Sequence, residues 1–300
     1  MQNFTKEPCR ISQVNGTPVF EFDISHFNSE EKVINNFGDE WNRFDSISEN
    51  DIIKFGETYF DILDENILNS NTYAVDLGCG TGRFSKYLSQ KVRFIESIDP
   101  SNSVNAAAKL MSGISNVRIS KAIIGSIPFN HETFDFGMSV GVLHHIPDTQ
   151  TALNDCVKLI KINGYFYVYL YYNFENAGFL FRLSFYCSDL IRRIVCRLPT
   201  KLKHFICDLL AIFIYLPFVY TGKILKKLGF IEFSQKIPLA YYQDKSYFII
   251  RNDSLDRFGT ALEHRFSKLE VIRMMKKAGL TDIIISSKMP FWHAVGRRER

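Results

Sequence analysis

The sequence predicts an α/β fold in which a mostly parallel sheet carries helices on both faces and is interrupted by a helical insertion. Between residues 73 and 172, short apolar runs alternate with helical stretches, a pattern typical of a parallel sheet covered on both sides. The alternation stops after Tyr172 and returns only near the end of the chain. The chain has 300 residues, of which 46% are hydrophobic and 23% charged, so it can bury a large core and is not disordered.

The apolar runs and the residues that punctuate them place the elements in order. An amphipathic helix is expected over residues 49–68, ahead of the alternating region. Strands are expected over residues 73–77, 93–98, 117–119, 134–140 and 165–171. The helices between them are expected over residues 83–90, from Ser101 through Ala108, and from Asp148 to Ile160, with Gly164 as the breaker. A last helix over residues 267–278 precedes strands over 282–286 and 291–296.

This pattern divides the chain into four parts. They are an N-terminal leader with a cap helix (1–70), an α/β core (71–172), a helical insertion over the acceptor (173–255), and a helix with strands that complete the core (256–300). Pro199 and Pro217 are expected to break the helices of the insertion. We interpret this part as an insertion because its polar content is too low to cover an independent surface.

Charge is spread unevenly along the chain. The segment Gly178–Phe230 carries nine basic and two acidic side chains, a balance of +7, although the whole chain has a formal charge of +4. The segment is also rich in Phe, Leu and Ile, which predicts peripheral membrane contact through residues 178–230 or a cover over a lipid-like acceptor. The alternative is a set of helices packed on the sheet, with Lys and Arg at the edge. Nucleic acid is not an expected partner, because the basic residues are interleaved with apolar side chains.

Cysteine usage and the apolar runs indicate the compartment. The six cysteines form no CxxC pair and no regular spacing, which favours reduced thiols over a disulfide framework or a metal site. The N-terminal residues lack the apolar region of a secretory signal. The longest apolar run, residues 209–220, contains Pro217 and is shorter than the roughly 20 residues of a spanning helix. We therefore expect a cytoplasmic protein that contacts membranes only at their surface.

The most informative stretch is Val75–Phe84, which reads VDLGCGTGRF. Glycine stands at alternate positions 78, 80 and 82 between a strand and a helix, where it permits a sharp turn and the close approach of a ligand. Asp99 ends the next strand, where a carboxylate can accept hydrogen bonds from both hydroxyls of a ribose. Strand, loop, helix and carboxylate together predict a site for a nucleotide-type cofactor.

Two alternatives apply to this loop. An NAD-dependent oxidoreductase shares the fold, but its GxGxxG fingerprint requires glycine where this chain has Arg83. A non-catalytic binding or scaffolding module could also retain the fold, although the intact Asp76, glycines and Asp99 favour an enzyme.

The segment Asp76–Gly82 (DLGCGTG) resembles the first motif of class I S-adenosylmethionine-dependent methyltransferases that act on small molecules. Residues 127–135 resemble that family's approach to its fourth strand, and Val142–Asp148 (VLHHIPD) resembles the segment after that strand. Phe37–Trp41 also resembles a leader of some bacterial members. The resemblance covers residues 73–172 well and the last thirty weakly. It implies a Rossmann-like class I methyltransferase fold with an antiparallel last strand, and S-adenosyl-L-methionine as the cofactor.

The resemblance also assigns roles to individual residues. Gly78, Cys79 and Gly80 would lie against the methionine portion of the cofactor, Asp76 would hold its ammonium group, and Asp99 its ribose hydroxyls. The further cofactor-binding residues that it implies are Gly82, Pro100, Ile123, Ile124 and Ser139. Ile123 and Ile124 stand where the family often has an Asp–Ala pair near adenine, so adenine would rely on backbone groups and apolar contacts.

Methyl transfer requires the alignment of two reactants and the exclusion of water, and it needs no metal. The expected reaction is O-methylation of a small-molecule or lipid-linked acceptor, for which a general base is useful. The candidate bases are His144 and His145, just after the fourth strand, and His264, before the last helix. Each could instead be a structural histidine. Cys79 is expected to pack beneath the cofactor and not to act as a nucleophile.

Overall fold

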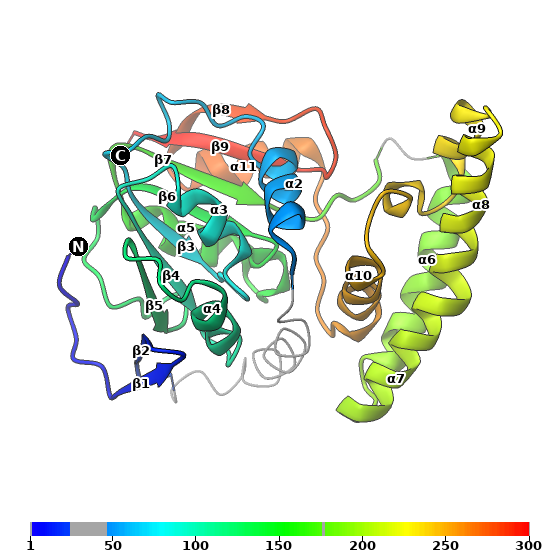
Figure 1. The fold of residues 1–300 in the computed structure, drawn as a ribbon. Helices are drawn as coiled ribbons and strands as arrows, with labels where there is room; N and C mark the ends of the chain where they lie inside the picture. The colour runs from blue at the N-terminus through cyan, green and yellow to red at the C-terminus, as the bar shows by residue number, and fades with distance from the viewer. Residues whose placement is uncertain (1, 25–46, 176–177, 300) are drawn as a thin grey trace. The chain divides into compact units, whose positions relative to one another are not determined.

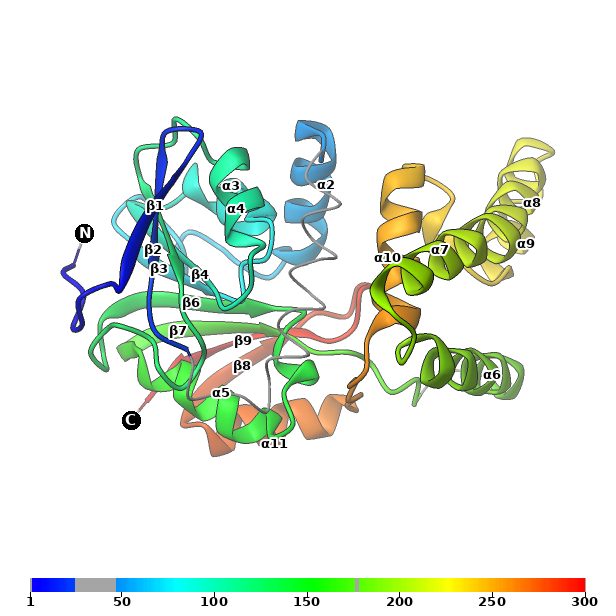
Figure 2. The ribbon, with the colours of Figure 1, turned by 90° about the horizontal axis from the view of Figure 1, so that it is seen from below.

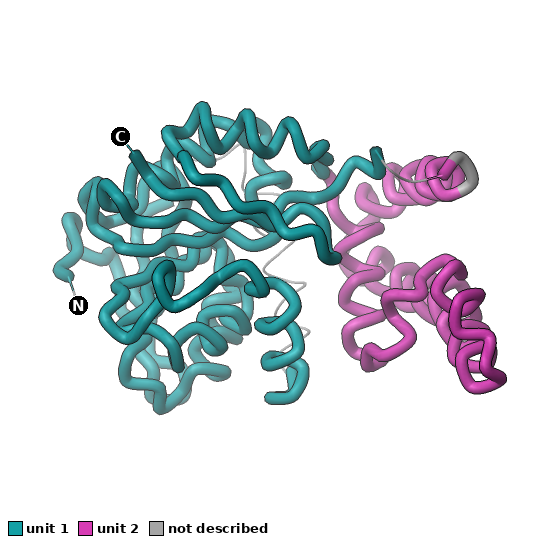
Figure 3. The backbone as a smooth tube through the Cα atoms, turned by 90° about the horizontal axis from the view of Figure 1, so that it is seen from above, with its two compact units in different colours: residues 1–175, 262–300 teal, residues 176–261 magenta. Residues whose placement is uncertain are grey.

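A computed structural model describes residues 2–24, 47–175 and 178–299. The chain divides into two compact units, residues 1–175 with 262–300 (unit 1) and residues 176–261 (unit 2), as Figure 3 shows. The segment Phe37–Trp41, which resembles a family leader, lies outside the described residues.

Unit 1 is built on one mixed sheet with the strand order β1-β2-β5-β4-β3-β6-β7-β9-β8 (Figure 1). The strands are β1 (Arg10–Val14), β2 (Thr17–Glu21), β3 (Tyr73–Leu77), β4 (Phe94–Asp99), β5 (Val117–Lys121), β6 (Phe134–Val140), β7 (Ile160–Tyr169), β8 (Leu280–Ile285) and β9 (His293–Arg298). Strands β2, β5, β4, β3, β6 and β7 are parallel, whereas β9 runs antiparallel to β7. The predicted α/β fold with an antiparallel last strand is confirmed.

Helices cover both faces of this sheet (Figure 2). On one face lie α2 (Glu49–Tyr59), α3 (Arg83–Ser89) and α4 (Val104–Leu110), and on the other lie α5 (Thr149–Lys158) and α11 (Lys268–Lys277). Side-chain caps fix several helix starts: Ser48 accepts a hydrogen bond at the start of α2, and Asp148 at that of α5. Ser267 and Glu270 form a capping box at the start of α11.

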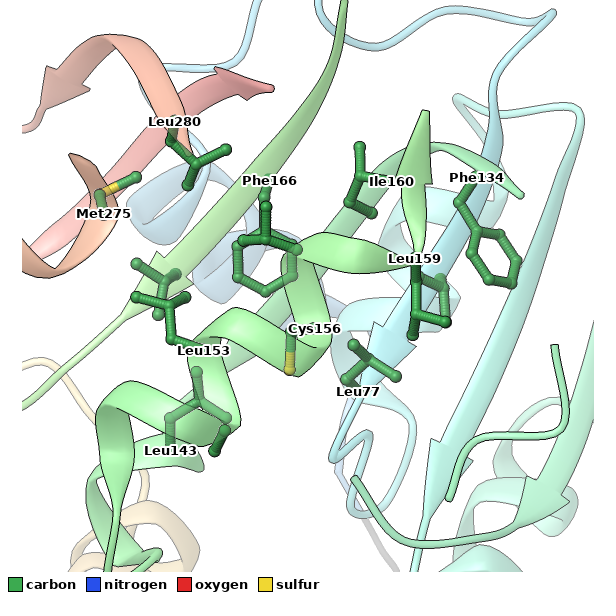
Figure 4. Close-up of a cluster of buried hydrophobic side chains, with 14 of the residues drawn as sticks. Leu77, Phe134, Leu143, Leu153, Cys156, Leu159, Ile160, Phe166, Met275 and Leu280 are labelled. Carbon is green, nitrogen blue, oxygen red and sulfur yellow. The ribbon is translucent and has the colours of Figure 1, made fainter. Parts of the chain in front are cut away.

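The core between the sheet and the α5–α11 layer is apolar and closely packed (Figure 4). Leu77 from β3, Phe134 from β6 and Phe166 from β7 are fully buried there, together with Leu153 and Cys156 from α5. All five residues of β3 are buried, as expected for a central parallel strand. The sheet edge that carries the glycine loop is therefore held by a rigid core.

Four elements differ from the sequence-based expectation. The hairpin β1–β2 was not predicted, although its Asn15-Gly16 turn, with φ of +49° and +77°, is the typical signal of a two-residue hairpin. Helix α2 ends at Tyr59 instead of near residue 68, because the Asp64 side chain accepts hydrogen bonds from two following backbone amides and forms a turn.

The start of α4 and the course of β7 also differ. Helix α4 begins at Val104, because the Ser101 hydroxyl donates to the Asp99 side chain and does not cap the helix. Strand β7 begins at Ile160 and runs through Gly164, so this glycine does not separate helix from strand. A Cβ at Gly164 would lie 2.7 Å from the Asp135 carbonyl oxygen, so glycine there permits close contact between β7 and its neighbour.

Unit 2 is helical. Its helices are α6 (Phe179–Val195), α7 (Thr200–Leu210), α8 (Leu216–Lys227), α9 (Ile231–Lys236) and α10 (Tyr247–Gly259), with a π-helical turn η2 (Ala211–Tyr215) and a 3₁₀ turn η3 (Ala240–Tyr242). The predicted break at Pro199 is confirmed, since Pro199 is the N-cap of α7. The predicted break at Pro217 is wrong. Pro217 lies in the first turn after the π-helical segment, where its missing amide is tolerated.

The uninterrupted segment Thr200–Lys227 changes one expectation. Of the residues that the structure describes, it is the one helix long and apolar enough, by length and composition, to cross a membrane. The expected break at Pro217 predicted a shorter helix than the one observed. Of its most apolar 18-residue window, 28% is buried.

A short strand-like neck closes unit 1 where unit 2 is inserted. Tyr172 and Phe266 form a parallel β-bridge, in which the Phe266 amide donates to the Tyr171 carbonyl at 2.8 Å and the Asn173 amide to the Phe266 carbonyl at 3.1 Å. The Lys268 amide donates to the Glu175 carboxylate at 2.8 Å. Hydrogen bonds thus join the two segments of unit 1, residues 1–175 and 262–300, next to the point where unit 2 is inserted.

Candidate functional site

The glycine loop follows β3 at the edge of the sheet where the parallel strands end. Gly78, Gly80 and Gly82 have φ of +85°, +54° and +79°, in the region that favours glycine. A Cβ at Gly78 would lie 2.5 Å from the Val142 side chain, and one at Gly82 would lie 2.6 Å from Met111. Both conformation and space therefore require glycine at these two positions, because Val142 and Met111 occupy the places that a Cβ would take.

Asp99 ties this loop to the end of β4. Its Oδ2 accepts a hydrogen bond from the Gly80 amide at 2.9 Å, and its Oδ1 accepts from the Ser101 amide at 2.8 Å and the Ser101 hydroxyl at 2.6 Å. A carboxylate oxygen can accept two hydrogen bonds, so Oδ2 keeps capacity for a ribose hydroxyl. The residues present thus fit an adenosine-type cofactor, and Pro100 continues the same turn.

Asp76 is fully buried one residue before the end of β3. The Ser85 hydroxyl donates to its Oδ2 at 2.7 Å, and the Ser97 hydroxyl donates to that of Ser85 at the same distance. Burial is the largest cause that raises the pKa of Asp76, the hydrogen bond from Ser85 and the charge of Arg83 lower it, and the charge of Asp99 raises it, with a net result of about 7. A cation beside Asp76 would favour its ionised form.

Cys79 packs against α4 and is not an activated thiol. Burial, together with the charges of Asp99 and Asp76, raises the pKa of the Cys79 thiol well above its usual value. Its side chain is buried in an apolar cluster with Val104 and Ala107. This packing is consistent with the expectation that Cys79 is not a nucleophile, and its place beneath the cofactor stays a prediction.

The remaining cofactor candidates flank the same edge. Ile123, buried, and Ile124, partly buried, follow β5, whose last residue pairs with Asp99 across the sheet. The buried Ser139 hydroxyl donates to the Leu77 carbonyl at 2.8 Å, so its side chain joins β6 to β3. Only the backbone of Ser139 is then available to a ligand.

The structure brings the three candidate histidines together. His144 and His145 lie in the 3₁₀ turn η1 (Leu143–His145) with ring centroids 4.1 Å apart. The His264 amide donates to the His144 carbonyl at 2.9 Å, and the Nδ1 of His264 lies 3.4 Å from the Thr149 hydroxyl oxygen. Val142, which contacts Gly78, precedes His144 by two residues, so this histidine cluster adjoins the glycine loop.

His144 has the most unusual environment of the three. It is 0% exposed, its ring centroid lies 3.7 Å from that of Tyr171, and neither ring nitrogen has a hydrogen-bond partner within the described ranges 2–24, 47–175 and 178–299. Burial lowers its pKa well below the usual value, and the nearby His145, Arg265 and His264 lower it further. His144 is therefore neutral near pH 7 and can accept a proton or a hydrogen bond.

His145 has a defined tautomer. Its Nδ1 lies 2.7 Å from the Leu262 carbonyl oxygen. Because a carbonyl only accepts, Nδ1 carries the hydrogen, and in the neutral ring Nε2 holds the lone pair.

Sequence reasoning missed an aromatic wall and an aspartate–histidine hydrogen bond at this edge. The Tyr59 ring lies 5.1 Å from Phe84 and 5.2 Å from Tyr169. Asp61 bonds His293 Nε2 at 2.7 Å, and although burial raises the pKa of Asp61, hydrogen bonds from His293 and other neighbours hold it below its usual value. No local signal could reveal this pair, since its members are 232 residues apart. Among the described residues, no group of three or more His, Cys, Asp or Glu could hold a metal ion.

Replacing Asp99 with alanine is expected to weaken S-adenosylmethionine binding by roughly ten- to a hundredfold, because hydrogen bonds to a charged group contribute about 1.5–3 kcal/mol. Calorimetry with S-adenosylmethionine, and with NAD as the control ligand, measures this. Asp99→Asn separates the charge from the hydrogen bond to Gly80. Tight NAD binding, or an unchanged affinity in Asp99→Ala, would show that the ribose lies elsewhere.

Cofactor affinity is expected to rise with pH through about 7, because only ionised Asp76 attracts the ammonium group of the cofactor. The folded chain holds this proton between the usual carboxyl pKa and about 7, so stability without ligand should fall as pH rises across the same window. Calorimetry in buffers of different ionisation enthalpy measures the proton released on binding. Asp76→Asn should remove the pH dependence, and an equal dependence in that variant would contradict the assignment.

Sequence comparisons with known proteins find methyltransferases over this region. Residues 75–168 match the family model described as a methyltransferase domain. The chain is 32% identical over 91 residues to a ubiquinone biosynthesis O-methyltransferase of Bradyrhizobium diazoefficiens, covering 30% of this chain and 36% of that protein. It is 26% identical over 132 residues to the protein of that name from Coxiella burnetii, covering 40% of this chain and 56% of the relative.

The chain also aligns with a solved structure. A SAM-dependent methyltransferase from Thermotoga maritima aligns with 91% of this chain and 96% of its own, at 15% identity and a TM-score of 0.46. The chain spans between about a third and somewhat more than half of the length of the curated relatives named above. Residues 75–168, which carry the glycine loop and the histidine pair, thus match a methyltransferase domain, and this match supports S-adenosyl-L-methionine as the cofactor.

Proposed function

We propose that the whole chain is an S-adenosylmethionine-dependent methyltransferase that methylates a hydroxyl group of a small-molecule or lipid-linked acceptor. The match of residues 75–168 to a methyltransferase domain supports the activity, and the similarity to ubiquinone biosynthesis O-methyltransferases supports transfer to oxygen. The cofactor would lie on the backbone of Gly78 and Gly80, with its ribose on Asp99. The ammonium group of the cofactor would lie near Asp76.

One observation carries the assignment of the acceptor site. His144 is fully buried and, among the residues that the structure describes, neither of its ring nitrogens has a hydrogen-bond partner; such a group is costly unless a ligand completes it. It lies beside the glycine loop, where Gly78 contacts Val142. A hydroxyl group of the acceptor is the partner that fits a neutral imidazole nitrogen.

The cofactor, the histidine cluster and the neighbouring aromatic rings would then have separate roles. The bound cofactor supplies an electrophilic methyl group on a sulfonium. His144 or His145 would accept the acceptor's hydroxyl proton on a ring nitrogen as the acceptor oxygen is methylated. His264, through its backbone bond to His144 and its contact with Thr149, positions the pair. The aromatic rings of Tyr59 and Tyr169 exclude water from the reacting atoms.

The two alternatives are disfavoured by specific observations. Arg83 begins α3 where an NAD-binding loop requires glycine, and its guanidinium lies 4.9 Å from the centroid of the Phe55 ring. A non-catalytic module would have no need of a buried, unpaired histidine next to the cofactor loop.

The experiment is a methyl-transfer assay. The protein is given ¹³C-methyl-labelled S-adenosylmethionine and phenolic acceptors with and without a lipid tail. The ¹³C chemical shift of the product distinguishes methyl groups on oxygen, nitrogen and carbon. Labelled methyl ethers support the proposal. Cofactor binding without transfer to any acceptor supports the scaffolding alternative, and N- or C-methyl products overturn the assignment to oxygen.

We also propose a cytoplasmic chain that contacts membrane surfaces through residues 178–230. The support is the +7 balance of that segment and its exposed apolar side chains. Such contact would bring the enzyme to a lipid-linked acceptor.

A further inference from the structure

Large apolar side chains are exposed along two helices of unit 2. Phe213 is 72% exposed and Tyr186 is 70% exposed. We define the apolar surface as Leu183, Tyr186, Leu190 and Ile194 on α6, with Phe205, Ile212, Phe213, Tyr220 and Ile224 on the long helix Thr200–Lys227. The α6 members recur every three or four residues and so form one stripe. Single exposed apolar residues are ordinary, but a stripe of them along one face of a helix indicates an interaction site.

The opposite side of the long helix is buried within unit 2. Its buried stripe consists of Lys203, Cys207, Ala211, Tyr215 and Val219, at a spacing of four residues. An α-helix has 3.6 residues per turn, so such a stripe would wind around the helix. The wider π-helical turn η2 offsets part of this drift. The long helix is therefore two-sided along its whole length.

The buried side faces charged groups of α10. Arg251 donates two hydrogen bonds to Asp208, at 2.7 and 2.9 Å, and the Ser254 hydroxyl donates to the Cys207 carbonyl. α10 packs on both α6 and α7, and Arg257 on α10 donates to the Ser188 hydroxyl on α6. If the long helix crossed a bilayer, these charges would lie at the depth of the acyl chains, which is costly.

The net positive charge of unit 2 indicates which kind of surface it binds. Unit 2 carries thirteen basic and six acidic side chains, a balance of +7. Exposed basic residues flank the apolar surface at the end of α6 and at both ends of the long helix, namely Arg193, Arg197, Lys201, Lys223 and Lys227. Apolar side chains bordered by cations complement a bilayer with anionic headgroups.

We propose that unit 2 docks on an anionic membrane with the long helix parallel to the membrane plane. The apolar surface enters the upper acyl region, the basic residues contact the headgroups, and α10 lies on the side away from the lipid. This inference rests on the membrane contact in the proposed function, and it adds the orientation and the residues that insert.

The first experiment measures binding of the full chain to vesicles of phosphatidylglycerol and phosphatidylcholine, with vesicles of phosphatidylcholine alone for comparison. Phe213→Ser and Leu190→Ser should each weaken binding at least about tenfold, because each removes a large inserted side chain. Ile11→Ser is the matched control, since Ile11 is 55% exposed on β1 of unit 1. Circular dichroism verifies that each variant is folded. Equal losses in the control variant, or no loss in the unit 2 variants, would overturn the inference.

The second experiment measures orientation. Tryptophan is introduced separately at Phe205, Phe213 and Tyr220, and its quenching by lipids brominated at shallow or deep acyl positions is measured after subtraction of the wild-type signal. A helix parallel to the membrane predicts that all three positions are quenched best by the same shallow lipids. Deep quenching of the Phe213 position with shallow quenching of the other two indicates a spanning helix and overturns the orientation.

Failure of this inference differs from failure of the proposed function. A chain that transfers methyl groups to a soluble acceptor but binds no vesicle keeps its activity and loses the docking model. The apolar surface would then be a contact for a protein or a second copy, which sedimentation would detect. A chain that binds vesicles in the stated orientation but transfers no methyl group supports the docking model and overturns the proposed activity.

Discussion

Replacing Glu96 with alanine is expected to destabilise unit 1 by about 3–5 kcal/mol, because it leaves the buried Arg118 guanidinium without its partner. Glu96 is 0% exposed on β4, and Arg118 on β5 donates to both of its carboxylate oxygens at 2.8 Å. The Tyr73 hydroxyl donates to the same carboxylate at 2.6 Å. Arg118 also donates to the Gln2 carbonyl and lies 3.9 Å from the centroid of the Phe4 ring, so the loss would release the N-terminal segment.

Urea unfolding measures this effect. Glu49→Ala is the matched control, because Glu49 forms an exposed ion pair with Lys86 at 2.8 Å and should cost less than about 1 kcal/mol. A Glu96→Leu/Arg118→Leu double variant should recover most of the lost stability, since neither buried charge remains. Equal losses in Glu96→Ala and Glu49→Ala would show that the buried pair is not what holds these strands.

Removing the histidine pair is expected to have the largest effect on catalysis. His144→Ala or His145→Ala should lower turnover of a hydroxyl acceptor by about 100-fold or more, while cofactor affinity stays nearly unchanged. Since burial lowers the pKa of His144, the acid limb of the wild-type rate profile should lie below the usual histidine range if His144 is the base. Steady-state kinetics across pH, with calorimetry of cofactor binding, measures both quantities.

The control for this series is His131→Ala, since His131 is exposed and outside the cluster. His144→Gln keeps much of the side-chain volume beside Tyr171 and separates loss of the base from loss of packing. If both alanine variants retain wild-type turnover, the pair is structural, and the proton leaves through His264 or through the acidity of the acceptor itself.

The α/β core was predictable from the sequence because its local signals agree with its tertiary structure. Strand β3 has the predicted bounds, Tyr73–Leu77, since a buried apolar run ends directly at glycines that need positive φ. The hairpin β1–β2 was missed because its strands are half polar and lie at the sheet edge, where burial gives little pattern. The continuity of Thr200–Lys227 was missed because a proline was read as a break without regard to the π-helical turn before it.

The candidate site was predictable only in part. Residues that follow strand ends within one segment, such as Gly78, Asp99 and His144, were found from spacing and resemblance. The partners that complete the cluster arrive from far along the chain: Leu262 bonds His145 from 117 residues away, and His264 contacts Thr149 from 115 residues away. Spacing in the sequence carries no record of such contacts, because the topology of the sheet alone brings them together.

The neck at Tyr172 and Phe266 gives the chain a modular design. Because backbone hydrogen bonds already join the two ends of unit 1, a short turn in place of residues 176–261 would have little distance to close and little entropy to lose. The order and register of β7, β9 and β8 do not depend on what lies beyond that junction. An insert of another length or composition could therefore replace residues 176–261 while the strands of unit 1 keep their pairing.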